Sequence, residues 1–288
     1  VHCEILATEV TQKMYQSVMA KNPSNFKGDN LPVENVSYFD AIYFCNLLSK
    51  SEGLEPVYAV NGKKSVSQWN YKPHRENEIE GKITQDLSAD GYRLPTVEEW
   101  KYAAKGGEDY SYAGSDNINK VAWYEDNRGY TTHPAAQKKA NGYGLYDMSG
   151  NVWEWCWDVY PYYNYGDDRY KCGGSYYDGE YDGADLCKVD HRSDRNAYCA
   201  YGNGYDDLGF RLVRSLSKPL FCEESLKPKM VKIPGKNYEM MATEVTQGLY
   251  ESVMGENPSY FQVKNIDEIE REYSSCDVRV VLKNGSMN

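Results

Sequence analysis

The sequence contains no run of Lys and Arg residues. Its 32 basic side chains are outnumbered by 43 acidic ones, which gives a formal net charge of -11. A nucleic-acid-binding protein needs a basic face to neutralise phosphates, so nucleic acid is not expected as a partner. Long apolar runs are also missing. None approaches the roughly 20 residues that a membrane-spanning helix needs, so no membrane span is predicted.

Cysteine never occurs as a CxxC pair, which argues against a zinc site of the usual spacing. The density is also too low for a disulfide scaffold. We expect buried free thiols, with one or two bridges, for example between Cys187 and Cys199, as the open alternative. The eight cysteines are Cys3, Cys45, Cys156, Cys172, Cys187, Cys199, Cys222 and Cys276.

Phenylalanine is scarce, with 6 residues, whereas tyrosine is abundant, with 28. Because the tyrosine hydroxyl requires water or a hydrogen-bond partner, much of this aromatic surface should lie at boundaries. Apolar residues make up 41% of the chain, which is enough for a globular core. The length of 288 residues allows one large domain, or one domain with a smaller additional piece.

Residues 173–210 have the composition of a binding loop. They read GGSYYDGEYDGADLCKVDHRSDRNAYCAYGNGYDDLGF, with no helical or strand period. Tyrosine gives a large contact area with few rotatable bonds, while Asn, Ser and Gly adapt their hydrogen bonding. The alternative is a solvated loop that binds nothing, but the Tyr content would expose more aromatic area than such a loop needs. The predicted contact residues are Tyr177, Asp178, Tyr181, Asp182, His191, Ser193, Asp194, Asn196, Tyr198, Tyr201, Asn203, Tyr205, Asp206 and Asp207.

His191 has no second histidine near it in the sequence, and Asp190 and Asp194 lie close by. We therefore interpret it as a hydrogen-bonding contact and not as a metal ligand.

Local patterns predict three helices. One begins after Thr11, one begins near Ser37 and stops at Gly53, and one is capped by Thr96 with Glu99 three residues later. Strands are expected at 56–60, at 152–157, where tryptophans alternate with other residues, and at 208–213. A polar loop is expected at 70–90.

The sequence contains an internal repeat. ATEVTQKMYQSVMAKNPSNF at 7–26 returns as ATEVTQGLYESVMGENPSYF at 242–261. Nothing after Phe261 repeats the rest of the first copy. We therefore predict a main domain at 1–216 and a partial repeat of its start at 217–288, either packed on the main domain or forming a small lobe.

Several segments together resemble the formylglycine-generating, or sulfatase-modifying-factor, family. They are LPVENVSYFDAIYFCNLLS at 31–49, GYRLPTVEEWKYAAKGG at 91–107, NGYGLYDMSGNVWEW at 141–155, CGGSY at 172–176 and LGFRLV at 208–213. The resemblance covers residues 5–215. It implies an α+β fold of the modified C-type lectin type, with irregular antiparallel sheets, a few helices and much loop.

The resemblance also bears on metals. The family's enzymes bind copper through two cysteines after the GGS motif, and those positions fall on Asp178 and Gly183 here. Neither residue can supply a thiolate, so no copper and no enzymatic activity are expected. The family also implies a structural calcium held by Asp147, Gly150, Val152 and Glu154, using carboxylate and carbonyl oxygens. A hydrogen-bonded turn without metal is the alternative.

The chain further resembles the variable proteins of diversity-generating retroelements, which use the same fold. Their last segment is randomised at adenines, mostly in codons for Asn, and residues 177–207 are mostly of the kind that this scheme yields. This implies a ligand-binding receptor for a protein or surface ligand, in a cell-surface or extracellular setting, with a lipid anchor as one option. A calcium-dependent lectin and a formylglycine-generating oxidase are the alternatives. Oligomeric state and the ligand are not determined by these residues.

Overall fold

The computed structural model describes residues 3–74, 78–160, 168–177, 183–196 and 206–215, and three short strands at 230–232, 239–241 and 278–281. For the three strands and for residues 194–196, only the backbone is described. The chain divides into two compact units. Residues 3–217 with 277–288 form the first, and residues 218–276 form the second. No helix in the described part of the chain is long and apolar enough to span a membrane.

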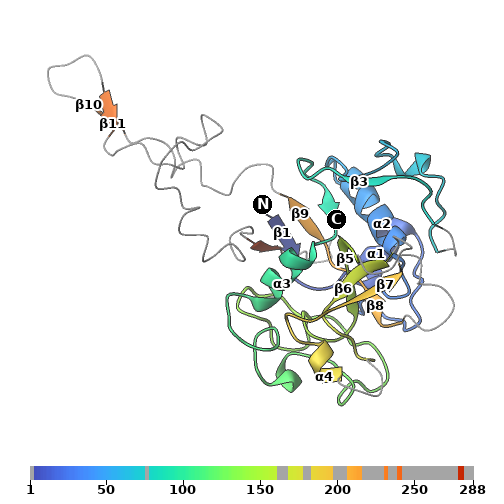
Figure 1. Ribbon diagram of the computed structural model, residues 1–288, viewed down its shortest axis with the longest axis vertical. Helices are drawn as coiled ribbons and strands as arrows, with labels where there is room; N and C mark the ends of the chain where they lie inside the picture. Colours follow the sequence, from blue (N-terminus) through green and yellow to red (C-terminus); the bar gives the residue numbers. More distant parts are fainter. Residues whose placement is uncertain are drawn as a thin grey trace. The chain divides into compact units, whose positions relative to one another are not determined.

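Two four-stranded sheets organise the first unit (Figure 1). One has the order β12-β1-β9-β4, in which β1 is antiparallel to β9 and parallel to β12. Its strands are β1 (Cys3–Leu6), β4 (Tyr92–Arg93), β9 (Val213–Ser215) and β12 (Val278–Val281). The other has the order β7-β6-β5-β8, with strands β5 (Trp153–Val159), β6 (Asp168–Cys172), β7 (Arg192–Asn196) and β8 (Leu208–Gly209).

The strand predicted at 208–213 is wrong as a single element, because the chain crosses here from one sheet to the other. Residues 208–209 pair with β5, whereas residues 213–215 pair with β1. Between them, the carbonyl groups of Phe210 and Leu212 accept hydrogen bonds from the backbone of Val10 and Leu6. The crossing therefore joins both sheets to the start of the chain.

The three predicted helices are confirmed. α1 (Gln12–Met19) is capped by Thr11, whose side chain accepts from the backbone N–H of Met14. α2 (Tyr38–Ser51) and α3 (Val97–Lys105) each begin with a reciprocal capping box, Ser37 with Asp40 and Thr96 with Glu99. Most of α2 is buried on every side, as expected of an apolar helix inside a core.

The predicted strand at 56–60 is confirmed in part, as β2 (Tyr58–Val60). It pairs with β3 (Ile83–Gln85), which lies in the stretch predicted to be a polar loop. That prediction missed β3 because its three residues are too few for a period-2 pattern to show. A short turn at Asn61 and Gly62, both with positive φ, closes an isolated bridge between Val60 and Lys63.

β5 is buried on both faces over its first residues, since Trp153, Glu154, Trp155 and Cys156 are all inaccessible. Trp157 is only half-buried. Between α3 and β5 the described chain forms only one short helix, η2 (Ile118–Lys120), so long loops dominate this region. α4 (Gly183–Leu186) lies among those loops (Figure 1), held by a bond from Ser149 Oγ to the carbonyl of Cys187.

The remaining elements are few. η1 (Val66–Gln68) precedes the buried Trp69 in the first unit. The second unit contains an antiparallel pair of strands, β10 (Met230–Lys232) and β11 (Glu239–Met241). Few helices, short strands and long loops agree with the predicted α+β class.

Candidate functional site

Glycines fix the backbone at both ends of the predicted binding segment. Gly174 has a φ of +72°, and a Cβ there would stand 2.6 Å from Cys187 Sγ. At the other end, a Cβ on Gly209 would stand 2.3 Å from the carbonyl oxygen of Val33. A side chain at either position would push neighbouring chains apart, so both ends are held close to the core.

Tyr177 is the predicted contact residue that the structure shows most clearly at the surface, with 52% of its area exposed. Its ring lies 4.6 Å from the guanidinium carbon of Arg128, which also stands 4.7 Å from the ring of Tyr130. Tyr130 is 78% exposed, whereas Arg128 is only 8% exposed. A buried cation thus orders two exposed aromatic rings.

Arg128 also retains a free hydrogen-bond donor. Its Nη2 lies 3.6 Å from a carboxylate oxygen of Glu125, but its buried Nη1 has no hydrogen-bond partner in the described part of the protein. A buried donor without a partner costs free energy, so this arginine is held at some cost to stability.

Asp206 and Asp207 are half-buried and are held by side chains from other loops. Asn25 donates its amide N–H to Asp206 at 3.0 Å, and Ser175 donates its hydroxyl to Asp207 at 3.0 Å. Phe26 packs edge-on against Tyr176, which neighbours Tyr177. These contacts connect one cluster of residues, here called the rim, made of Asn25, Phe26, Arg128, Tyr130, Tyr176, Tyr177 and Asp206.

The buried carboxyl group of Glu34 holds the backbone of two rim residues. Glu34 accepts the backbone N–H groups of Asn25 and Phe26, each at 2.9 Å. Burial raises the pKa of Glu34 to about 8, with a smaller contribution from the like charge of Asp206. The turn that carries Asn25 therefore depends on a carboxyl group that titrates near neutral pH.

His191 and Ser193 are half-buried. The His191 ring is 6.0 Å from Trp153, and Ser193 pairs with Lys171 between β7 and β6. For Asp194 and Asn196 the structure gives only their places in β7. Seven predicted contact residues lie outside the described residues: Asp178, Tyr181, Asp182, Tyr198, Tyr201, Asn203 and Tyr205.

The predicted calcium ligands surround a buried ion pair. Arg211 donates to both oxygens of Glu154, at 2.6 and 2.7 Å, and Trp100 Nε1 donates to the same carboxylate at 2.6 Å. Asp147 accepts the backbone N–H of Ala136 at 2.7 Å. Burial raises the pKa of Asp147 to about 6.

At Glu154, this arrangement competes with calcium. Arg211 already supplies the positive charge at Glu154, and the donors around that carboxylate point where a cation would need free lone pairs. Gly150 and Val152 are buried in the same turn, and the Gly150 N–H donates to the carbonyl of Gly173. Among the residues that the structure describes, no group of three or more His, Cys, Asp or Glu side chains could hold a metal ion.

Five cysteines fall within the described residues, and all of them are buried: Cys3, Cys45, Cys156, Cys172 and Cys187. Burial raises the pKa of the Cys156 thiol well above its usual range, which makes it a poor nucleophile. Cys199, the proposed partner of Cys187, lies outside the described residues, as do Cys222 and Cys276.

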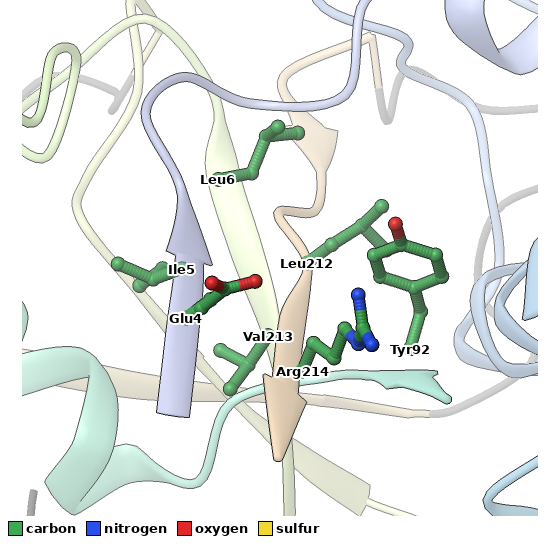
Figure 2. A pocket seen from close by; sticks show the side chains of 7 residues that line it. All are labelled: Glu4, Ile5, Leu6, Tyr92, Leu212, Val213 and Arg214. Atoms are coloured by element: carbon green, nitrogen blue, oxygen red, sulfur yellow. The ribbon is translucent and has the colours of Figure 1, made fainter. Parts of the chain in front are cut away.

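An apolar pocket lies on the first sheet. Figure 2 shows its lining side chains on β1, β4 and β9 and at Leu212 just before β9. They are Glu4, Ile5, Leu6, Tyr92, Leu212, Val213 and Arg214.

The family model described as the sulfatase-modifying factor enzyme 1-like domain matches residues 3–216. The chain belongs to the FGE-sulfatase family. The FGE-sulfatase match confirms the family predicted from the sequence motifs and, with it, the modified C-type lectin type of fold. Among solved structures, Treponema denticola variable protein 1 is 37% identical, with a TM-score of 0.65, and the match covers 74% of this chain and 84% of that one. CarF is 33% identical with a TM-score of 0.60, covering 74% and 86%.

Curated relatives of this FGE-sulfatase protein match over shorter stretches. Chaperone protein LppX of Paenibacillus barcinonensis is 44% identical over 52% of this chain and 60% of its own length. The inactive C-alpha-formylglycine-generating enzyme 2 of Mus musculus is 32% identical over 45% of each chain. The formylglycine-generating enzyme of Mycobacterium tuberculosis is 37% identical over 25% of this chain and 29% of its own. The chain thus spans 60% or less of the length of these curated relatives.

Sequence reasoning on this FGE-sulfatase chain missed the residues that complete the rim, namely Asn25, Phe26, Arg128 and Tyr130, and Glu34 beneath it. No local signal marks Asn25, Phe26 or Arg128, because each gains its role from a contact distant in sequence. Asn25 meets Asp206 across 181 positions.

Proposed function

We propose that this chain is a non-catalytic binding protein that presents a diversified Tyr- and Asp-rich surface on the FGE-sulfatase fold. The observation that carries the proposal is Tyr177, an exposed ring held in place by the buried Arg128. A preorganised aromatic side chain lowers the entropic cost of binding. The similarity to Treponema denticola variable protein 1 supports a variable segment at this place.

We also propose that this chain is not an enzyme. The positions of the family's two copper-binding cysteines fall on Asp178 and Gly183 in this chain. Gly183 begins α4 and has no side chain to offer a ligand. The relative from Mus musculus is named as inactive, which is in line with a family that also holds members without enzymatic activity.

The ligand that this surface favours is a protein or another surface molecule with basic or polar groups. Acidic side chains recur along the segment, at Asp178, Asp182, Asp190, Asp194, Asp206 and Asp207. They would speed association with cationic partners in a salt-dependent way. The Paenibacillus relative is named a chaperone, which agrees with a protein as the ligand. A cell-surface or extracellular setting follows from the resemblance to variable proteins.

Binding is tested with an array of purified extracellular and cell-surface proteins, probed with the full chain. We expect Tyr177→Ala to weaken any captured interaction about tenfold, the usual size of a tyrosine hot spot. Tyr110→Ala is the matched control, because Tyr110 is 41% exposed and lies outside the segment. Equal binding by both variants would contradict the proposed surface.

Diversification is tested in the genome. A near-copy of the DNA that encodes residues 173–213 should lie beside a reverse-transcriptase gene and differ only at adenines. A complete genome without that copy would remove the diversification and leave a binding protein of fixed sequence.

A further inference from the structure

The internal repeat has kept every residue that the fold buries in its first copy. We call residues 4–26 the head segment and residues 239–261 the tail segment. Six residues between Ala7 and Phe26 are buried in the structure, and the same residue types recur at the matching tail positions. They are Ala7, Glu9, Val10, Gln12, Tyr15 and Ser24, matched by Ala242, Glu244, Val245, Gln247, Tyr250 and Ser259.

Between Ala7 and Phe26, the positions at which the two copies differ lie on the surface, apart from one half-buried site where Met14 is matched by Leu249. The exposed pairs are Lys13 with Gly248, Gln16 with Glu251, Ala20 with Gly255, Lys21 with Glu256 and Asn25 with Tyr260. At Ala20 the backbone has a φ of +55°, a conformation that glycine adopts more easily. Gly255, the tail residue at this position, is therefore compatible with the backbone conformation that Ala20 adopts.

The contacts of the head segment are ones that the tail segment can reproduce. Backbone bonds link Leu6, Val10 and Gln12 to the residues around them, so they do not depend on side-chain identity. Gln12 donates its amide to two backbone carbonyls, and Tyr15 stacks on Phe44 with ring centroids 5.2 Å apart. Both side chains recur in the tail, as Gln247 and Tyr250.

The strand that precedes the repeat is also matched. β11 aligns with the last three residues of β1, so that Glu239, Met240 and Met241 stand for Glu4, Ile5 and Leu6. Those three β1 side chains line the pocket in Figure 2. Methionine is flexible and apolar, so it suits a site shaped by Ile and Leu. The tail segment also brings β10, already paired with β11, as an edge strand.

The place that the head segment occupies beside β9 is here called the slot. The path of the chain allows the tail segment to reach this slot. Ser215, the last residue of β9, pairs with Cys3 at the start of β1. Residues 216–237 then separate Ser215 from Tyr238, the position that matches Cys3. A connection of that length returns easily to the neighbouring strand position, and linkage within one chain gives a high effective concentration.

We propose that the tail segment exchanges with the head segment in the slot beside β9 of the same chain. The chain then has two alternative starts for its first sheet. Exchange replaces Asn25 with Tyr260 beside Asp206, which removes the amide–carboxylate bond and adds an aromatic ring to the rim. This last consequence alone rests on the proposed binding function.

The first test compares full-chain variants by thermal unfolding followed with circular dichroism. Tyr15→Ala damages the head copy, Tyr250→Ala damages the tail copy, and the third variant carries both changes. If either copy fills the slot, Tyr250→Ala leaves the midpoint unchanged, Tyr15→Ala lowers it, and the double variant lowers it by more than the two single shifts together. If Tyr15→Ala and the double variant unfold at the same midpoint, or both fail to fold, the exchange does not occur.

The second test traps the exchanged state with a disulfide. Antiparallel partners have Cα atoms about 4.5–5.5 Å apart, within the range that a disulfide bridges. Ser215→Cys should cross-link to the native Cys3, as the positive control. With Cys3→Ser, Ser215→Cys and Tyr238→Cys together, we expect a cross-link within the monomer, mapped by peptide mass spectrometry. A cross-link found only in dimers, or none, would overturn exchange within the chain. Neither test uses a ligand, so neither depends on the binding proposal.

Discussion

The guanidinium of Arg211 holds both carboxylate oxygens of Glu154 in the interior of the first unit, 57 positions apart in sequence. Both side chains are completely inaccessible to solvent. The other nitrogens of Arg211 donate to the backbone carbonyls of Leu6 and Tyr146. One buried ion pair thus ties β1, the loop before β5, and the crossing between the two sheets.

Removing one partner of this pair should strongly destabilise the fold. Glu154→Gln removes the carboxylate that pairs directly with the buried Arg211 charge, and we expect the free energy of unfolding to fall by about 3–5 kcal/mol. Urea unfolding measures this. Glu55→Gln is the control, because Glu55 pairs with Lys64 at the surface, and such a pair contributes about 1 kcal/mol or less. Similar losses in the two variants would show that the buried pair has no special weight.

Calcium should have little effect on stability, because Arg211 already neutralises Glu154. We expect the thermal midpoint to be the same in excess calcium and in EGTA. A midpoint that rises with calcium concentration would instead show that calcium binds the folded state, and would restore the site predicted at Asp147 and Glu154.

The pKa of Glu34 predicts a pH dependence of stability. Because burial raises this pKa to about 8 from a usual 4.5, the folded state binds the proton more tightly than the unfolded state. The contribution of Glu34 to the free energy of unfolding is full below pH 4.5. It declines as the pH rises towards 8, by at most about 1.4 kcal/mol per pH unit. Glu34→Gln should remove this slope. Denaturant unfolding between pH 5 and 9 tests it, and parallel curves for the two proteins would argue against a shifted Glu34.

The contact between Arg128 and Tyr177 should appear as a coupling energy. In a double-mutant cycle with Arg128→Ala and Tyr177→Ala, we expect about 0.5–2 kcal/mol of coupling, the range for a partly desolvated cation–π pair. The same cycle with Tyr110 in place of Tyr177 is the control, because Arg128 and Tyr110 share no contact in the described structure. Strictly additive effects for Arg128 and Tyr177 would mean that the arginine does not order this ring.

At Gly174, the loss of stability caused by a steric clash can be separated from the loss caused by the left-handed backbone conformation. Gly174 and Gly53 have nearly equal φ values of +72° and +73°, but a Cβ at Gly53 would meet nothing within 4 Å. Gly53→Ala should therefore cost about 1–2 kcal/mol for the left-handed backbone alone. Gly174→Ala should cost about 1–3 kcal/mol more, because its Cβ would collide with Cys187. Equal losses would show that the segment relaxes around the added methyl group.

The sequence by itself determined the features that are local or that recur along the chain. Thr11, Ser37 and Thr96 predicted three helix starts because a cap is a contact between residues two or three positions apart. The family motifs predicted the α+β fold, and the repeat at 242–261 was visible without coordinates. β3 escaped notice, because its three residues are too few to show a period.

Only the tertiary structure decided which distant side chains meet. Glu154 was predicted as a metal ligand, and its partner turned out to be Arg211. Tyr177 was predicted at the surface, but nothing local indicated that Arg128 would hold it. The split of 208–213 between two sheets likewise follows from what lies beside each half. Such pairings depend on how the chain crosses between the two sheets, and no local sequence pattern encodes that path. The electrostatic energy of a charged side chain depends on how deeply it is buried, and burial is likewise not encoded locally.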